Sequence, residues 1–292
     1  MASQGKVSVV LPVLNEEENI VVLVRDLSDL FAKLPYELEV IIVNDGSGAP
    51  TTAALQRLCQ QYPQVGVLHL SRNFGHQAAL SAGLDEAGGD AVIVMDSDLQ
   101  HPVAVIPELI GRWENGADIV FTVRSDAPTL PPLKRMTSRL FYRVINGLSE
   151  GVITPGAADF RLMNRPAVDA LREMPERTRF LRGLSAWIGF RQDFVPFVPA
   201  ARRSGQSKYD FAYMLRFALD GIISMSTAPL KLALLTGTLL SGISFVYLVY
   251  VVWAYYYTNR SIIGWSSLIV AMLFLGGLQI NLIGVLGLYI GK

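Results

Sequence analysis

The sequence predicts an α/β domain built on a largely parallel sheet, followed by an amphipathic helix and a C-terminal pair of membrane-spanning helices. Short runs rich in Val and Ile alternate with helical patterns between residues 6 and 125. Polar clusters directly follow three of these runs, and no charged residue occurs in 232–257 or in 261–291. Strands that are apolar on both faces are typical of a parallel sheet covered by helices. We therefore predict three parts, at 1–208, 209–229 and 230–292.

Five apolar runs are the predicted strands of the first part, at 6–12, 38–44, 65–71, 90–96 and 118–124. Helical patterns lie between them, at 16–33, 51–62, 75–87 and 103–114. The polar clusters "NEEEN", "NDGSG" and "DSDLQ" follow the first, second and fourth runs. Open α/β sheets bind ligands at the carboxyl ends of their strands, so we expect the three clusters to form one site on one rim.

Residues 126–229 show a less regular pattern, with two amphipathic helices expected. The first is a proline-started helix over 128–148, and the second covers 209–225, just before the apolar C-terminal segments. Apolar side chains of the second helix recur at helical spacing. Such a helix can lie in a membrane interface or face an ordinary core, and the pattern leaves both open.

The two charge-free segments, 232–257 and 261–291, each exceed the roughly 20 apolar residues that a spanning helix needs. A short link joins them, and Trp253, Tyr257 and Trp265 lie near it, as interfacial aromatic residues do. We predict a transmembrane hairpin. A pair of buried helices in a soluble core is the alternative, and two such segments in succession are hard to bury without lipid.

Composition excludes several classes of function. Lys plus Arg and Asp plus Glu balance at 25 each, whereas a dedicated nucleic-acid binder normally carries a basic excess. Cys59 is the single cysteine, so no intrachain disulfide can form, and one Cys with three His cannot build a Cys/His zinc cluster. A bound metal would therefore be a hard cation held by oxygen atoms.

The cluster "DSDLQ" has the donor set of such a cation site. Asp96, Asp98 and Gln100 alternate after an apolar strand, and two carboxylates with an amide oxygen can converge on Mg²⁺ or Mn²⁺. The cation would neutralise a diphosphate leaving group. The alternative is that Asp98 caps the helix that follows.

The glycines of "NDGSG" do not complete a dinucleotide-binding fingerprint, because Thr51 stands where the third glycine belongs. Asp45 would also crowd an anionic pyrophosphate. A carboxylate at this strand end can instead accept hydrogen bonds from a nucleobase or a ribose. A turn-forming Asp is the alternative.

Together with "VSVVLPVLNEEENI", "SRNFGHQAALSAGLDEA", "AADFRLMNR" and "RRSGQSKY", these motifs resemble the polyprenyl-phosphate glycosyltransferases. These are family 2 enzymes with the Rossmann-like GT-A fold, and they include dolichol-phosphate mannose synthase and the bactoprenol glucosyl transferases. The resemblance covers essentially the whole chain. It implies a catalytic domain on the cytosolic face of a bacterial inner membrane. It also implies inverting transfer of a sugar from a nucleotide sugar, usually UDP-linked, to undecaprenyl or another polyprenyl phosphate. Glucose is the expected sugar, with mannose and formamido-arabinose left open.

The resemblance also implies roles for individual residues. Pro12, Glu16, Asp45 and Asp96 match positions that hold the nucleotide sugar, while Asp96, Asp98 and Gln100 match the metal ligands. Asp159 matches the acid near the reacting sugar. The positions that match contacts to the acceptor phosphate are Arg124, Lys134, Ser138, Arg202, Arg203, Ser207 and Lys208.

A lipid monophosphate is mostly a dianion at neutral pH, since its second pKa is near ~6. It therefore needs no deprotonation, and Asp159 could position the substrates and stabilise charge, or act as a base. A processive polysaccharide synthase is disfavoured, because that resemblance requires a Q-x-x-R-W motif and further spans. A non-enzymatic scaffold would not need the three polar motifs together. Small residues at Gly276, Gly277 and Gly284 favour helix packing, and we expect a homo-oligomer.

Overall fold

A computed structural model describes the two ends of the chain as separate compact units. The first unit holds the described residues up to 200, and the second holds those from 230 on. The described residues are 5–124, 157–174, 179, 181–200, 230, 235–239, 264–290 and the single positions 242, 246, 249, 250, 253, 256 and 257.

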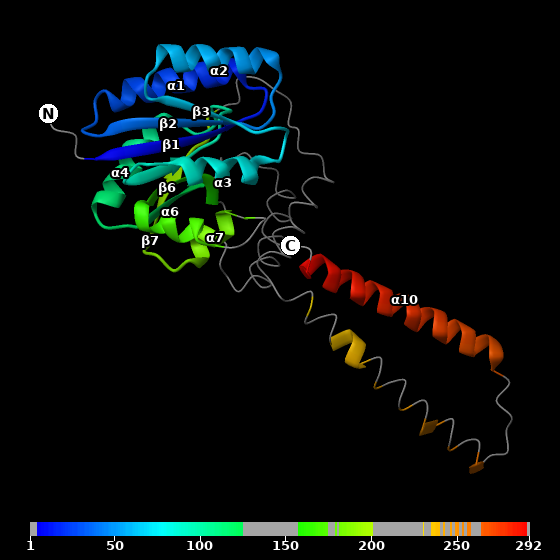
Figure 1. The fold of residues 1–292 in the computed structure, drawn as a ribbon. Helices are drawn as coiled ribbons and strands as arrows, with labels where there is room; N and C mark the ends of the chain where they lie inside the picture. The colour runs from blue at the N-terminus through cyan, green and yellow to red at the C-terminus, as the bar shows by residue number, and fades with distance from the viewer. Residues whose placement is uncertain are drawn as a thin grey trace. The chain divides into compact units, whose positions relative to one another are not determined.

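A seven-stranded mixed sheet forms the centre of the first unit (Figure 1). Its order is β3-β2-β1-β4-β6-β5-β7. The strands are β1 (Lys6–Val13), β2 (Glu37–Asn44), β3 (Val65–His69), β4 (Ala91–Val94), β5 (Ile119–Arg124), β6 (Ala157–Asn164) and β7 (Gln192–Phe197). The five predicted strands are confirmed as β1 to β5, and the α/β class is confirmed with them.

Strand β6 makes the sheet less parallel than the sequence predicts. It lies between β4 and β5 and runs antiparallel to both, whereas the pairs β1–β2, β1–β4, β2–β3 and β5–β7 are parallel. Asp159 and Arg161 interrupt its apolar run, so the pattern typical of a buried strand is missing. The two charges are nevertheless buried, because they pair with each other inside the protein.

Helices cover both faces of the sheet. On one face α1 (Glu17–Phe31), α2 (Ala49–Gln61) and α4 (Ile106–Glu114, preceded by the 3₁₀ turn Val103–Val105) pack with the odd-numbered residues of β1 into the main core. The other face carries α3 (His76–Glu86), α6 (Arg165–Arg172) and α7 (Leu181–Trp187). Figure 1 shows α1 and α2 on one side of the sheet and α3 and α6 on the other.

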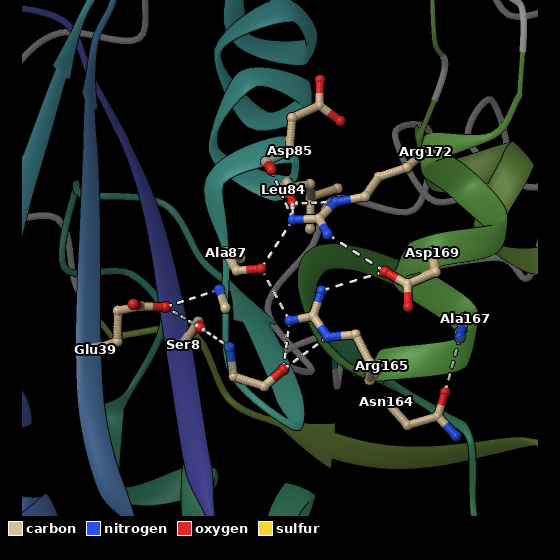
Figure 2. Close-up of polar contacts among 12 residues, drawn as sticks. Ser8, Glu39, Leu84, Asp85, Ala87, Asn164, Arg165, Ala167, Asp169 and Arg172 are labelled. Atoms are coloured by element: carbon tan, nitrogen blue, oxygen red, sulfur yellow. Dashed lines mark hydrogen bonds and ion pairs between the residues drawn. The ribbon is translucent and has the colours of Figure 1, made fainter.

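Two arginines of α6 hold the end of α3 (Figure 2). Arg172 donates to the carbonyl oxygens of Leu84, Asp85 and Ala87 at 2.6–2.8 Å through Nη2. Arg165 donates to the carbonyls of Ala87 and Gly89. The last carbonyls of a helix have no partner within it, so these two cations satisfy them and fix α3 against α6.

The second unit contains the helix α10 (Trp265–Ile290), and residues 235–239 are also helical. Side chains of α10 are described only in part. Within the residues that the structure describes, no helix combines the length and the apolar character needed to cross a membrane. The amphipathic helices predicted over 128–148 and 209–225 lie outside the described residues.

Candidate active site

The carboxyl ends of β1, β2 and β4 meet on one rim of the sheet. Val13 at the end of β1 pairs with Asn44 at the end of β2, and Val10 pairs with Val94 of β4. The Ser97 hydroxyl donates to the carbonyl oxygen of Pro12 at 2.9 Å and ties the loop after β4 to β1. The predicted clusters therefore converge on one rim, as expected.

Backbone contacts lock the loops after β1 and β2 together. The Asn15 carboxamide accepts from the Gly48 N–H at 2.9 Å, and the Asn15 N–H donates to the Ser47 hydroxyl at 3.1 Å. Gly46 has φ +73°, and a Cβ there would lie 2.6 Å from the backbone of Arg72 and Asn73. A side chain at this position would therefore push away the segment that precedes α3.

Asp45 is buried at this junction and accepts two backbone hydrogen bonds. The Phe74 N–H donates to Oδ1 at 2.7 Å and the Gly75 N–H to Oδ2 at 3.0 Å. These bonds shape the turn that begins α3. Each carboxylate oxygen can accept a second hydrogen bond, so Asp45 can still accept hydrogen bonds from a ligand.

The "DSDLQ" segment forms a tight turn after β4. The Gln100 N–H donates to Asp98 Oδ1 at 3.1 Å, and Leu99 between them has φ +61°. The alternative of Asp98 capping the next helix is not seen, since the residue before the 3₁₀ turn is Pro102. Ala200, where the described chain leaves β7, donates its N–H to the Gln100 carbonyl at 3.1 Å.

Two histidines flank Asp96. His76 Nε2 lies 3.3 Å from Asp96 Oδ1, and His101 Nε2 lies 3.7 Å from Oδ2. The Asp96 N–H donates to His101 Nδ1 at 3.1 Å, which places the proton of a neutral His101 on Nε2. The His101 ring is buried, stacked on Phe160 at 5.1 Å between ring centroids.

Asp159 comes from β6 and lies beside the same cluster. The antiparallel register pairs Val94 with Arg161, and the two acids beyond this pair, Asp96 and Asp159, both lie near His76 Nε2. Arg182 of α7 donates to Asp159 Oδ2 at 2.7 Å, and Arg161 donates to Oδ1 at 3.2 Å. His76 Nε2 lies 3.6 Å from Oδ2. Asp159 therefore sits between three groups that can carry positive charge.

These contacts set the ionisation of the cluster. Burial alone would raise the pKa of Asp159, but the positive charge of Arg182, together with Arg161 and the nearby His76, outweighs it and holds that pKa well below its ordinary value. Burial lowers the pKa of Arg161 to about 10 and lowers the pKa of His101. For His76, burial is outweighed by Asp159 and Asp96, so its pKa is raised.

The donor set fits a cation bound together with substrate phosphates. The Asp96 side chain is 29% exposed, so part of its carboxylate can face a ligand on the rim. Among the described residues no three His, Cys, Asp or Glu side chains form a metal cluster on their own. Mg²⁺ is usually held by one or two carboxylates and by phosphates of the substrate, so a complete protein cage is not expected.

The family model for glycosyl transferase family 2 matches residues 8–172. This chain belongs to glycosyl transferase family 2. The matched residues run from β1 through α6 and include Asp45, Asp96 and Asp159.

Curated relatives match this glycosyltransferase along nearly its whole length. A bactoprenol glucosyl transferase of Shigella phage SfV is 42% identical over 98% of this chain and 94% of its own. An uncharacterized glycosyltransferase of Synechocystis is also 42% identical, over 98% of this chain and 90% of its own.

A solved structure shares the GT-A fold. The glucosyl-3-phosphoglycerate synthase from Mycobacterium tuberculosis, in complex with Mn²⁺, UDP and phosphoglyceric acid, matches with a TM-score of 0.57. It is 20% identical, and the match covers 76% of this chain and 78% of that one.

The structure brings together some of the residues predicted for this glycosyltransferase. Asp96, Asp98, Gln100 and Asp159 lie on the rim, with Pro12 and Asp45 beside them. Glu16 accepts from the Asn19 carboxamide at the start of α1, and Arg124 is exposed at the end of β5. The predicted residues outside the described part are Lys134, Ser138, Arg202, Arg203, Ser207 and Lys208.

Sequence reasoning missed four members of the site: His76, His101, Arg161 and Arg182. His101 directly follows "DSDLQ", and His76 follows the glycine that begins α3, so their positions next to strand and helix ends were available as a signal. The sequence held no such signal for Arg182, because only the packing of α7 against β6 brings this side chain to Asp159.

Proposed function

We propose that this family 2 glycosyltransferase transfers a sugar, with inversion, from a UDP-linked donor to undecaprenyl or another polyprenyl phosphate. Glucose from UDP-glucose is the proposed donor group. The observation that carries the proposal is the convergence of Asp45, Asp96 and Asp159 on one rim of a glycosyltransferase fold. The bactoprenol glucosyl transferase that matches 98% of the chain supports the acceptor and the sugar.

The donor is assigned to the loops after β1, β2 and β4. Pro12, Glu16 and Asp45 would hold the nucleoside, with Asp96 near the diphosphate. Asp96, Asp98 and Gln100 would hold a divalent cation, Mg²⁺ or Mn²⁺. The partly exposed carboxylate of Asp96 and the Mn²⁺ and UDP of the solved synthase support this assignment. The cation would neutralise the diphosphate as it leaves.

The environment of Asp159 favours positioning over proton abstraction. A carboxylate whose pKa is held low by Arg182 and Arg161 is a weak base. The acceptor phosphate is already an anion and needs no base. Asp159 would instead orient the reacting groups and stabilise the positive charge that develops on the sugar ring.

The acceptor phosphate is assigned to Arg124 and to a set of cationic and hydroxyl residues that lie outside the described part of the chain. Arg124 is exposed at the end of β5. Its charge adds to the effect of burial in lowering the pKa of His101. Ala200 contacts Gln100, and Arg202 and Arg203 follow it within three residues of sequence. Lys134, Ser138, Ser207 and Lys208 complete the proposed set. Arginine suits this task because its guanidinium pairs bidentately with phosphate.

The C-terminal segments are proposed to anchor the enzyme in a bacterial inner membrane, with the α/β domain facing the cytosol, where nucleotide sugars are made. Leu268, Met272 and Ile290 of α10 are 57%, 68% and 85% exposed, and lipid would cover such apolar side chains at lower cost than water. The amphipathic segment 209–225 is proposed to lie at the membrane interface. A homo-oligomer is also proposed, packed through the small residues of the C-terminal helices.

The test uses membranes that contain the protein, undecaprenyl phosphate and a panel of radiolabelled nucleotide sugars, with Mg²⁺, Mn²⁺ or EDTA. We expect label from one donor to enter the lipid phase, and we expect EDTA and the Asp98→Ala variant to abolish this transfer. The donor that labels the lipid identifies the sugar. Absence of lipid labelling from every donor, with a folded protein, would refute the proposed reaction.

A further inference from the structure

His76 is the first residue of α3 and lies between two carboxylates of the site. Its Nε2 is 3.3 Å from Asp96 Oδ1 and 3.6 Å from Asp159 Oδ2. One N–H can be directed at only one of these oxygens at a time. Which carboxylate accepts from His76 therefore depends on the other hydrogen-bond donors that each carboxylate has.

Asp159 is already well supplied with donors, whereas Asp96 is not. Arg182 and Arg161 both donate to Asp159. Asp96 Oδ1, by contrast, is a buried oxygen without a hydrogen bond. A buried acceptor without a partner is costly, so an N–H of His76 directed at Oδ1 is favourable. His76 is the polar group placed to satisfy that oxygen.

The second oxygen of Asp96 is the one left to face a ligand. The Asp96 side chain is 29% exposed although Oδ1 is buried. His101 Nε2 is 3.7 Å from Oδ2, which is too far for a good hydrogen bond, and this nitrogen has no other hydrogen-bond partner. One imidazole therefore lies near each oxygen of the carboxylate, and His101 makes no hydrogen bond to Oδ2.

The position of His76 is fixed by contacts at both ends of α3. At the start of α3, Asp45 holds the N–H groups of Phe74 and Gly75, and the Gln77 carboxamide accepts from the Leu181 N–H of α7 at 3.0 Å. At its other end the arginines of α6 hold the helix carbonyls (Figure 2). A helix held at both ends can place a side chain with the accuracy that a metal ligand requires.

We propose that His76 is a positioning residue that holds Asp96 through Oδ1 and so directs Oδ2 to the divalent cation. The inference rests on the proposed function, since it needs a cation at Asp96. The inference adds to the proposed function a residue that contacts neither the cation nor the substrate. Partners of this outer kind typically contribute 10- to 100-fold in metal affinity.

The test measures Mn²⁺ binding by electron paramagnetic resonance, with UDP present, on the detergent-purified full chain. We expect His76→Ala to weaken Mn²⁺ binding by about 10-fold or more. His76→Gln should restore most of the affinity, because a Gln amide nitrogen can take the place of Nε2 as a donor. Ser81→Ala is the matched control, since Ser81 lies further along α3 and bonds to the Gln77 carbonyl in the same helix.

The outcomes separate this inference from the proposed function. Wild-type affinity in His76→Ala would overturn the inference and leave the proposed cation site intact. Equal losses in His76→Ala and His76→Gln would also overturn it, because a neutral donor at the same place would then do nothing. A wild-type protein that binds no Mn²⁺ would refute the proposed cation site, and the inference with it.

Discussion

At the scale of single residues, the site depends on charges buried inside the sheet. Arg161 is 1% exposed, donates to Asp159, to the Leu181 carbonyl and to the Ser185 hydroxyl, and so depends on partners from two elements. Removing one partner from a buried ion pair leaves the other charge uncompensated. Asp159 is therefore a structural residue as well as a candidate catalytic one.

Asp159→Asn should lower the free energy of unfolding by about 3 kcal/mol, because it leaves Arg161 buried without its counter-charge. Thermal unfolding of the detergent-purified protein checks this. Asp98→Asn is the control, since Asp98 is partly exposed and an amide can keep its bond from the Gln100 N–H. Equal melting temperatures for the two variants would contradict the prediction. A loss of activity in Asp159→Asn should be interpreted only together with this measurement.

Glu39 gives a prediction about pH. Burial would raise its pKa, but hydrogen bonds from Lys6, Ser8 and the Gly88 N–H outweigh it and lower that pKa. Its ionised form therefore stabilises the fold above the unfolded value of about 4.3, and this contribution is lost as pH falls through the folded pKa.

Glu39→Gln should cost roughly 1–2 kcal/mol of stability at pH 7, where the charged acceptor is intact. The difference from wild type should shrink as pH falls below about 4. Urea unfolding of both proteins at several pH values measures this difference in stability. A difference that stays constant from pH 7 to pH 3 would show that the charge of Glu39 is not the cause.

At the scale of elements, α3 is the part that connects the core to the site. It lies closely against β1 and β2, and a Cβ at Gly83 would be 2.3 Å from Val10 and 3.0 Å from Val43. The same helix carries His76 at its start. A change in how α3 packs should therefore reach the site through the position of that side chain.

Gly83→Ala should destabilise the protein by about 1–3 kcal/mol, because a methyl group there forces α3 away from the sheet. It should also lower the glycosyl transfer rate without touching the site. Melting temperature and lipid labelling measured on one preparation test both effects. Gly111→Ala in α4 is the control, since a Cβ at that position has open space. Destabilisation of the control to the same extent would show that close packing at Gly83 is not the reason.

At the scale of the whole molecule, the proposed activity needs the α/β domain and a membrane anchor in one chain. The long charge-free segments near the C-terminus provide the argument for that anchor. We expect the full chain to stay in the membrane pellet after an alkaline carbonate wash. Its release into the supernatant would contradict a spanning hairpin and leave the α/β assignment unaffected.

Much of the fold follows from local pattern. The first five strands were predictable because each is a short apolar run next to a turn, and Asp45, Asp96 and Asp98 were predictable because polar residues stand where those runs end. Strand β6 was not, because Asp159 and Arg161 break its pattern. They are buried because they pair with each other and because Arg182 and Ser185, on a helix about twenty residues further along the chain, supply further hydrogen bonds.

The sequence by itself determined the α/β class, the rim on which the polar loops gather and the motifs of a family 2 glycosyltransferase, since these depend on the order and periodicity of neighbouring residues. Only the tertiary structure decided that β6 enters antiparallel between β4 and β5 and brings Asp159 next to Asp96. It also decided that His76 stands between these two acids. The physical reason is that strand register and the pairing of buried charges depend on contacts between segments far apart in the chain, and no local pattern records those contacts.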